Sequence, residues 1–453
     1  MARPNIVHLP YYPDASHWAM RLHDQPGFVW LDSAGSERGR FDILACRPRQ
    51  HIRIDGSNSD QYQSIKESFI DSARTILDRY SALDLSGEND WPLCAGWIGF
   101  WSYNLGLGQH GIEARADSLY PRAWAGFYDW ALCVDHQRQR CALLGHPDGD
   151  ADELQSIYKN LIRDTTQGLP AARFEPWQQS TQKPDYRRQF QRVQDYIAAG
   201  DCYQVNLARH FKSRCQGKPL EAYIRLRDIA RAPHSGFIDT GNGSLLSLSP
   251  ERFLSCREGQ VETAPIKGTA ARWRDPEADR KSAEALSASD KNRAENLMIV
   301  DLLRNDLGQV CDTGTVKVDK LFELQTFETV HHLVSQVSGR LRPDLNAMEM
   351  LQHCFPGGSI TGAPKRRAME IINELEPVDR GPYCGSVFYW STEDALDSNI
   401  AIRSFWQQDD YIHAWAGGGL VADSDCEEEF TETLSKIKRL LSVLNSEGIE
   451  GPD

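Results

Sequence analysis

The sequence predicts an α+β fold, with mainly antiparallel strands and separately grouped helices. Strand-like and helix-like stretches follow one another without the regular βαβ order of a doubly wound parallel sheet. Residues 236–249 carry an Asn-Gly turn between two apolar runs, which indicates a hairpin of antiparallel strands. The 453 residues suffice for about two to four domains or for one large one, and no short repeat indicates a solenoid.

The remaining elements follow from local patterns. Alternation of apolar and polar residues predicts a strand at 327–341, and residues 411–424 predict a strand that enters a glycine turn. Eight of the twelve Trp precede residue 178, which predicts an aromatic core in that part of the chain. Helices are expected at 186–199, 289–305, 365–375 and 426–445. The Gln-, Pro- and Thr-rich stretch 166–184 is expected to join an N-terminal region (1–165) to a longer C-terminal region (185–446).

Composition excludes several classes of function. There are 50 Lys and Arg against 64 Asp and Glu, and a net charge of −14 makes nucleic acid and membrane surfaces poor partners. No run of about 18 apolar residues predicts a membrane span, and the first residues have no apolar signal segment. Eleven Cys without a CxxC pair indicate reduced thiols and a cytoplasmic protein.

Two helices carry carboxylates that need an explanation. Apolar residues cover nearly all sides of 289–305, which predicts a buried helix, so Glu295 must be paired, protonated or bound to a cation. In 426–445, Glu429, Glu432 and Lys436 share a side apart from the apolar stripe. That side is either a solvated face or a second carboxylate site for a hard cation, because Mg²⁺ is usually held by one or two carboxylates.

Two glycine runs and one lysine remain as candidates. Residues 355–365 lack the lysine position of a P-loop, and 416–424 lack the acidic residue of a dinucleotide site, so neither predicts nucleotide binding. Both offer turn amides that can cradle a carboxylate. Lys267 lies in a short apolar segment and is either a surface lysine in a turn or an amine nucleophile. His331 and His332 face opposite ways in one strand, and no spacing indicates zinc.

Seven strings together resemble the chorismate-utilising enzymes, the family of the anthranilate, isochorismate, salicylate and aminodeoxychorismate synthases. Residues 39–48 and 95–106 also resemble the family's N-terminal region. The resemblance implies a single large α+β unit of packed β-sheets flanked by helices. The strings are GDCYQVNLARHF (200–211), LSLSPERFL (246–254), APIKGTAAR (264–272), DKNRAENLMIVDLLRNDLG (290–308), VHHLVSQVSG (330–339), FPGGSITGAPKRRAMEII (355–372) and AGGGLVADSDCEEEFTETLSK (416–436).

One residue separates the branches of this family. Anthranilate synthases have Ala where this chain has Lys267, and the resemblance to the aminodeoxychorismate branch implies a lysine nucleophile that attacks chorismate at C2 and displaces the C4 hydroxyl. Ammonia then adds at C4 and expels the lysine, which gives 4-amino-4-deoxychorismate. Glu251 matches the family's acid/base residue. Glu295 and Glu432, with Glu429 nearby, match the carboxylates that hold Mg²⁺.

Other positions match less specific roles. Phe388 stands where relatives usually carry Gly, which is expected to narrow one wall of the pocket. The substrate-binding residues implied by the resemblance are Gly268, Thr269, His332, Arg403, Gly417, Gly418, Gly419 and Lys436. The residues that loosely match a tryptophan site of relatives are Ser33, Arg38, Gly39, Arg40, Phe41, Pro233, His234 and Ser235.

The expected partners are chorismate, ammonia and a separate glutamine amidotransferase subunit, because no Cys-His amidotransferase motif occurs in this chain. L-Tryptophan is a further candidate ligand. Two alternatives stay open: a sibling anthranilate or isochorismate synthase, and a non-catalytic sensor of tryptophan or chorismate.

Overall fold

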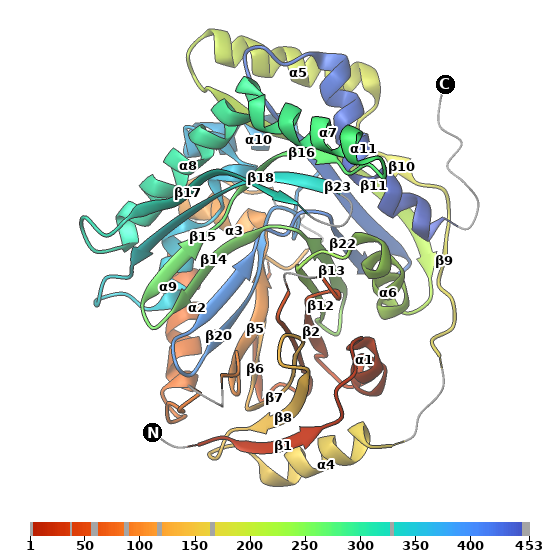
Figure 1. Cartoon of the computed structure of the whole chain (residues 1–453), viewed down its shortest axis with the longest axis vertical. Helices are drawn as coiled ribbons and strands as arrows, with labels where there is room; N and C mark the ends of the chain where they lie inside the picture. The colour runs from red at the N-terminus through yellow and green to blue at the C-terminus, as the bar shows by residue number, and fades with distance from the viewer. Residues whose placement is uncertain are drawn as a thin grey trace.

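The fold consists of two large β-sheets with helices around them (Figure 1). The computed structural model describes residues 3–36, 39–55, 62–85, 90–115, 120–163, 168–326 and 330–445. Strand pairing within both sheets is antiparallel, so the predicted α+β class is confirmed.

The first sheet has thirteen strands in the described part of the chain, and β9 (Arg173–Phe174) and β19 (Gly362–Ala363) pair with β11 off its main path. The order along the path is β1 (Asn5–Leu9), β8 (Arg140–Gly145), β7 (Trp130–Asp135), β3 (Phe41–Ala45), β2 (Val29–Asp32), β12 (His234–Asp239), β13 (Ser244–Ser249), β22 (Ser404–Gln408), β23 (Tyr411–Leu420), β11 (Gln204–Gln216) and β10 (Gln178–Gln179).

The second sheet has ten described strands, and β17 (Lys317–Thr326) pairs with β18 at one edge. The order along its path is β16 (Ile266–Ala271), β18 (Val330–Arg340), β15 (Gln260–Thr263), β14 (Arg252–Arg257), β21 (Leu396–Asn399), β20 (Ser386–Ser391), β5 (Gly96–Trp101), β6 (Ala123–Tyr128) and β4 (Gln50–Ile54).

Helices cover both ends of the molecule, with α1 and α4 at the end that carries β1, and α5, α10 and α11 at the opposite end (Figure 1). The helices of the described residues are α1 (Ser16–Leu22), α2 (Tyr62–Leu77), α3 (Tyr103–Gln109), α4 (Ala151–Leu161), α5 (Lys183–Ala198), α6 (Pro219–Ala230), α7 (Pro276–Ala288), α8 (Asp290–Val310), α9 (Ala347–Cys354), α10 (Lys365–Leu375) and α11 (Cys426–Leu444).

The four helices expected from the sequence are confirmed as α5, α8, α10 and α11. Side-chain caps set two of their N-termini: Ser289 accepts a hydrogen bond from the backbone of α8, and Asp425 accepts two from α11. The prediction that α8 is buried on nearly all sides is wrong. Leu297 on this helix is 52% exposed. It lies outside the face of α8 that packs on β18.

The N-terminal region (1–165) and the C-terminal region (185–446) both contribute strands to each of the two sheets. The strands of the two regions join where β2 pairs with β12 in the first sheet and where β5 pairs with β20 in the second. The described part of the stretch 166–184 contributes β9 and β10, which extend the first sheet along β11. The single large unit implied by the resemblance is therefore what the strand order shows.

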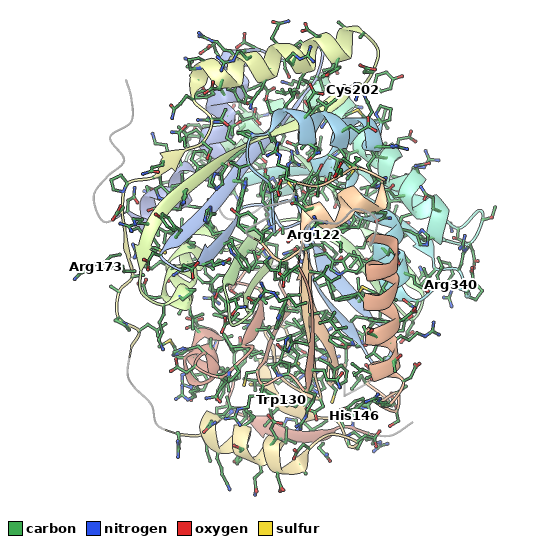
Figure 2. All side chains as sticks on the ribbon, turned by 180° about the vertical axis from the view of Figure 1, so that it is seen from behind. Arg122, Trp130, His146, Arg173, Cys202 and Arg340 are labelled. Carbon is green, nitrogen blue, oxygen red and sulfur yellow. The ribbon has the colours of Figure 1, made fainter. Side chains whose placement is uncertain are left out.

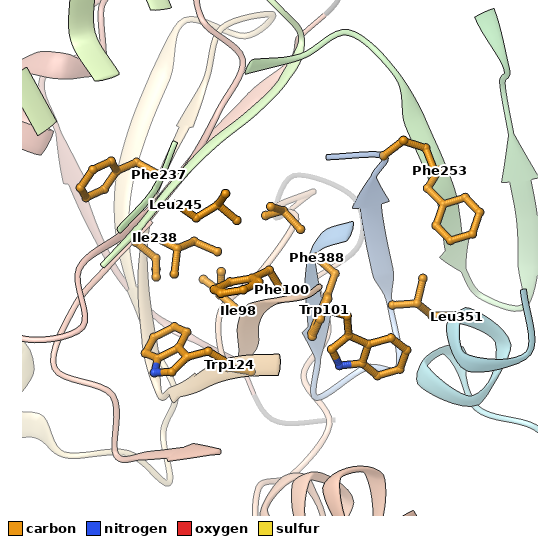
Figure 3. Close-up of a cluster of buried hydrophobic side chains, with 14 of the residues drawn as sticks. Ile98, Phe100, Trp101, Trp124, Phe237, Ile238, Leu245, Phe253, Leu351 and Phe388 are labelled. Atoms are coloured by element: carbon orange, nitrogen blue, oxygen red, sulfur yellow. The ribbon is translucent and has the colours of Figure 1, made fainter. Parts of the chain in front are cut away.

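The core fills the space where the two sheets pack together. Phe100 of β5 and Trp406 of β22 meet with ring centroids 5.9 Å apart, and Trp101, Trp124 and Phe237 lie in the same cluster (Figure 3). The predicted aromatic core is confirmed by these buried side chains.

Figure 2 shows the side chains of the described residues from the side opposite to Figure 1. Seen from behind, Trp130 and His146 lie near the α4 end and Cys202 near the α5 end (Figure 2). All eleven cysteines are free, and only Cys426 is not fully buried. None of the described helices has the length and apolarity needed to cross a membrane.

Candidate active site

Lys267 lies in strand β16, next to a β-bulge. The pairing of β16 with β18 shifts between Lys267 and Thr269, so Gly268 is the extra residue, and its φ of +78° is one that glycine adopts without strain. A Cβ on Gly268 would also lie 2.9 Å from the Leu286 side chain. Lys267 is half-buried, so the alternative of a surface lysine in a turn is wrong.

The Lys267 amine points to a backbone carbonyl of a different segment. Its Nζ donates to the Ser359 carbonyl oxygen at 3.4 Å, and Ser359 lies in a short 3₁₀ turn, Gly358–Ile360. Burial lowers the pKa of Lys267 below its ordinary value, although the Glu251 and Glu295 carboxylates oppose this effect. The local environment therefore makes the neutral, nucleophilic form of this amine more accessible than it is for an exposed lysine.

Glu251 immediately precedes β14 and is 6% exposed. Its backbone is fixed on both sides: its N–H donates to Ser249 Oγ at 3.1 Å, and its carbonyl accepts from Ile400 at 3.0 Å. Ser359 Oγ donates to Glu251 Oε1 at 3.0 Å. Burial raises the pKa of Glu251 to about 7, although Lys267 and the Ser359 hydroxyl lower it. A carboxyl with this pKa can hold a proton near neutral pH and deliver it to a leaving group.

Glu429 faces the glycine segment of β23 from the first turn of α11. It is 5% exposed and accepts a hydrogen bond from Ser424 at 2.8 Å. Burial raises the pKa of Glu429, with Glu432 acting in the same direction. A Cβ on Gly418 would lie 3.1 Å from Glu429 Oε2, so the absence of a side chain at Gly418 keeps this carboxylate close to the strand.

Glu432 and Lys436 form an ion pair of 2.8 Å one turn apart on α11. Burial alone would raise the pKa of Glu432, but the charges of Lys436, Lys291 and Lys267 lower it below its ordinary value. Lys291 belongs to α8 and Lys267 to β16, so α11 faces both elements. The prediction that Glu429, Glu432 and Lys436 share one side of the helix agrees with these contacts.

The donor set suits a hard cation that completes its shell with other ligands. Glu295 and Glu432 both act on the charge of Lys267, and Glu429 lies one helical turn from Glu432. Among the described residues, no three His, Cys, Asp or Glu side chains converge tightly enough to hold a metal by themselves. Mg²⁺ ordinarily uses one or two carboxylates together with water and substrate oxygens, so the residues present fit it.

The glycines of 416–424 form a strand rather than the expected turn. Gly417, Gly418 and Gly419 pair with β11, so the prediction of a glycine turn there is wrong. The opposite edge of β23 is paired with β22 only as far as Ala414 in the described residues. On that open edge Lys436 Nζ donates to the Gly417 carbonyl at 3.1 Å. Backbone groups of a strand edge, not turn amides, are therefore what this segment offers a ligand.

Two further predicted positions lie on β16 and β18. Thr269 Oγ1 and His332 Nδ1 are 2.9 Å apart, while His331 contacts Thr326 and Asp279 instead. The prediction that the two histidines face different surroundings is confirmed. His332 is thereby linked to the strand that carries Lys267.

Arg403 has properties suited to an anion. It is half-buried, and burial lowers the pKa of its guanidinium without any carboxylate acting on it. Its φ of +52° places it in the left-handed region, a strained conformation for a residue with a side chain. Within the described chain no acidic side chain pairs with it, so a substrate carboxylate could be its counter-ion.

Ser359, Lys291 and Ser424 are contacts that the sequence analysis did not identify. Ser359 lies in the run 355–365, which was interpreted only as a source of turn amides. Its position three residues before the Gly-Ala-Pro-Lys segment carries no chemical signal by itself. A serine is recognisable as a site residue only once the fold places it between Lys267 and Glu251.

The residues associated with tryptophan are only partly brought together. Gly39 packs against Ser33, since a Cβ on Gly39 would lie 2.2 Å from Ser33 Cβ, and Ser235 pairs with Asp32 beside them. Arg40 is engaged by Asp90 and Asp135, and it covers the ring of Phe41. Arg38 lies outside the described residues. Tryptophan binding stays a prediction.

Pro233 and His234 instead line a separate cavity of about 240 Å³. Pro250, Arg252 and Ile266 also line it, whereas their neighbours Glu251 and Lys267 do not. The cavity therefore lies apart from the groups that could carry out chemistry.

Phe388 belongs to the aromatic core. It is 1% exposed, and its ring meets Trp101 at a centroid distance of 5.7 Å (Figure 3). The packing shown for this side chain is with Trp101, and a narrowed pocket wall stays a prediction.

Lys267 is an amine beside a carboxyl that can hold a proton, and the carboxylates of α8 and α11 act on its charge. This combination, together with Arg403, which has no acidic partner among the described residues, is typical of an enzyme that acts on a small anionic substrate. The family of chorismate binding enzymes has a sequence model that matches residues 26–442, and the chain belongs to this family.

Curated relatives are similar over almost the whole chain. Aminodeoxychorismate synthase component 1 of Klebsiella aerogenes is 40% identical over 98% of this chain and 100% of its own length. The protein of the same name from Escherichia coli K12 is 41% identical over 96% of this chain and 95% of its own.

Solved structures share the fold. Anthranilate synthase component I from Streptococcus pneumoniae TIGR4 superposes with a TM-score of 0.75 at 28% identity, covering 90% of this chain and 93% of that one. The menaquinone-specific isochorismate synthase of Escherichia coli, at 20% identity, has a TM-score of 0.71 over 98% of this chain and 96% of its own and supports the fold alone.

Proposed function

We propose that this chain is a Mg²⁺-dependent enzyme that aminates chorismate to 4-amino-4-deoxychorismate, in the synthesis of 4-aminobenzoate. The observation that carries the proposal is the pairing of Lys267 with Glu251, an amine whose pKa is lowered beside an acid whose pKa is raised to about 7. Relatives about 40% identical over nearly the whole chain, named aminodeoxychorismate synthase component 1, support it.

The proposed chemistry has two substitutions. Neutral Lys267 forms a bond to C2 of the chorismate ring, the ring double bond shifts, and the C4 hydroxyl leaves as water with the proton of Glu251. Ammonia then forms a bond at C4, the double bond returns, and the lysine nitrogen leaves C2 with its electron pair as a neutral amine. The excess proton of the new C4 ammonium group returns to Glu251. The covalent intermediate divides one difficult displacement into two easier ones.

The charged groups around Lys267 and Glu251 would orient the substrate. We expect Arg403 and the open edge of β23 to bind the carboxylates of the substrate, and Lys436 connects that edge to α11. Mg²⁺, held by Glu295, Glu432 and Glu429, would neutralise a ring carboxylate and stabilise negative charge. The net charge of −14 on the chain is compatible with an anionic substrate, because part of the acidic excess would hold this cation.

The test is incubation with chorismate, MgCl₂ and ammonium chloride, followed by addition of the lyase that releases 4-aminobenzoate. 4-Aminobenzoate is the expected product, and anthranilate or isochorismate would overturn the proposal in favour of a sibling activity. Lys267→Ala should abolish the product. Lys281, a surface lysine of α7 with a 70% exposed side chain, provides the matched control as Lys281→Ala.

A mass increase on Lys267 after incubation with chorismate and Mg²⁺ without ammonium tests the covalent step directly. Lys267→Ala should bind chorismate without forming the adduct, whereas the sensor alternative predicts that this substitution leaves function intact. A wild-type protein that binds chorismate but forms neither adduct nor product would make the sensor the better function.

We propose further that a separate glutamine amidotransferase subunit supplies the ammonia. The isolated chain should use ammonium but not glutamine, and addition of the amidotransferase subunit should confer glutamine use. Glutamine-dependent product from the isolated chain would contradict this division of labour.

A further inference from the structure

Ser359 contacts both groups of the proposed reaction through different atoms. Its hydroxyl donates to Glu251 Oε1 at 3.0 Å, and its carbonyl oxygen accepts from Lys267 Nζ at 3.4 Å. Lys267 lies on β16 and Glu251 precedes β14, so one residue of the 3₁₀ turn connects groups from two other segments. Ser359 itself is 6% exposed.

The turn around Ser359 is held in place from several sides. Thr361 Oγ1 donates to the Gly357 carbonyl at 3.1 Å, and the Thr361 N–H donates to the Gly358 carbonyl at 3.3 Å. Arg380 Nη1 donates to the Ile360 carbonyl at 2.9 Å. Because these bonds fix the backbone, both the carbonyl and the hydroxyl of Ser359 have restricted positions.

Packing adds to the same restriction. A Cβ on Gly357 would lie 2.7 Å from the Ile400 side chain, and one on Gly358 would lie 3.2 Å from Leu302 of α8. The two glycines therefore let the turn approach α8 and the segment after β21 closely. The turn is a rigid support from which Ser359 reaches the two reacting groups.

We infer that Ser359 is a positioning residue, which holds the acid Glu251 and the amine Lys267 at a fixed separation so that attack at one ring carbon and protonation at another occur on the same bound substrate. This inference rests on the proposed function. In the first step Ser359 keeps the Glu251 carboxyl oriented toward the leaving hydroxyl, and its carbonyl orients the Lys267 amine toward the ring. It contributes no atom to the bonds that form or break.

Few groups of the described residues act on the charge of Glu251, so the effect of the Ser359 hydroxyl on the pKa of Glu251 can be measured separately. Lys267 faces it from β16, Ser359 faces it from the 3₁₀ turn, and the Cys384 thiol lies close enough before β20 to feel its charge. Loss of the Ser359 hydroxyl removes a donor to the carboxylate, so the charged form of Glu251 becomes less favourable. The active form of the Glu251–Lys267 pair has lost one of its two protons, so the acidic limb of the pH profile reports loss of that first proton and should then move to higher pH.

The experiment compares Ser359→Ala, Ser359→Thr and the control Thr263→Ala, which deletes a buried hydroxyl outside this turn that donates to the Phe253 carbonyl of β14. For Ser359→Ala, kcat should fall about 10- to 100-fold with little change in the KM for chorismate, as for other supporting residues that orient a reacting group. The acidic limb of kcat/KM should rise above about 7. Ser359→Thr should restore the limb toward its wild-type position, and Thr263→Ala should leave the limb unmoved.

An unmoved limb in Ser359→Ala would overturn the inference, as would a Ser359→Thr limb equal to that of Ser359→Ala. An infrared titration of the Glu251 carboxyl, with Glu251→Gln to assign the band, measures the same shift without turnover. Absence of product from the wild-type enzyme would refute the proposed function, whereas a wild-type enzyme with full activity and an unchanged Glu251 titration in Ser359→Ala would refute only the role of Ser359.

Discussion

Replacement of Glu251 by Gln should make the protein more stable and almost inactive. The side chain is 6% exposed, and burial raises the pKa of this carboxyl from its ordinary 4.5 to about 7. Each pH unit of such a difference corresponds to about 1.4 kcal/mol, so the ionised carboxylate costs the folded protein about 3 kcal/mol. Gln keeps the shape and a hydrogen-bonding oxygen but has no charge.

The pH dependence follows from the direction of the shift. A carboxyl with a raised pKa in the folded state binds its proton more tightly than in the unfolded chain, so its destabilising effect grows as pH rises from 4.5 to about 7 and is constant above that. Glu251→Gln should therefore raise the free energy of unfolding by up to about 3 kcal/mol at pH 8 and by less than about 1 kcal/mol at pH 5.

Urea unfolding at the two pH values measures this difference. Activity should fall about 10²- to 10⁴-fold, the usual range for removal of a general acid. The rate of adduct formation on Lys267 without ammonium is the preferred assay, because ammonium itself titrates in the alkaline range. The wild-type profile should have an acidic limb near pH 7, since one proton is then shared between Glu251 and Lys267, and the variant should lack it. Equal stability gains at pH 5 and 8, or a variant with the wild-type rate, would refute the reasoning.

Three other perturbations test separate parts of the structure. Lys365→Met leaves Asp306, 4% exposed and 2.8 Å from Lys365 Nζ, without its partner, so stability should fall by about 3–5 kcal/mol in urea unfolding, and a loss under about 1 kcal/mol would contradict the buried pair. Glu432→Ala should raise the Mg²⁺ concentration needed for half-maximal activity at least tenfold in a metal titration, and an unchanged value would remove Glu432 from the metal site. Arg403→Lys should raise the KM for chorismate about tenfold because a bidentate contact is lost, and steady-state kinetics with an unchanged KM would contradict that role.

Local sequence patterns were sufficient to predict many helices and strands and to select the candidate site residues. The four predicted helices, the hairpin at 236–249 and, within the described part of 327–341, strand β18 occur because their apolar spacing and capping residues act over a few positions. Lys267, Glu251 and Glu432 could be chosen as candidates from the short sequence motifs in which they lie. Their roles came from the family resemblance.

The errors occurred where distant segments decide the outcome. Leu297 was placed in a buried helix, but which side of α8 is covered depends on β18, more than thirty residues away in sequence. Gly417 to Gly419 were interpreted as a turn, yet pairing with β11 makes them a strand. A run of glycines in the sequence is compatible with a turn and also with a strand that a neighbouring side chain approaches closely, so the run alone does not decide between them.

The sequence by itself determined the class of fold, the acidic composition and the residue types available for chemistry. Those properties depend on composition and on neighbours along the chain. Tertiary structure alone decided that Ser359 lies between Lys267 and Glu251, that burial shifts their pKa values in opposite directions, and that Glu295 of α8 and Glu432 of α11 both act on the charge of Lys267. The physical reason is that desolvation and charge interactions depend on distance in space, and the groups concerned come from segments up to about 180 residues apart.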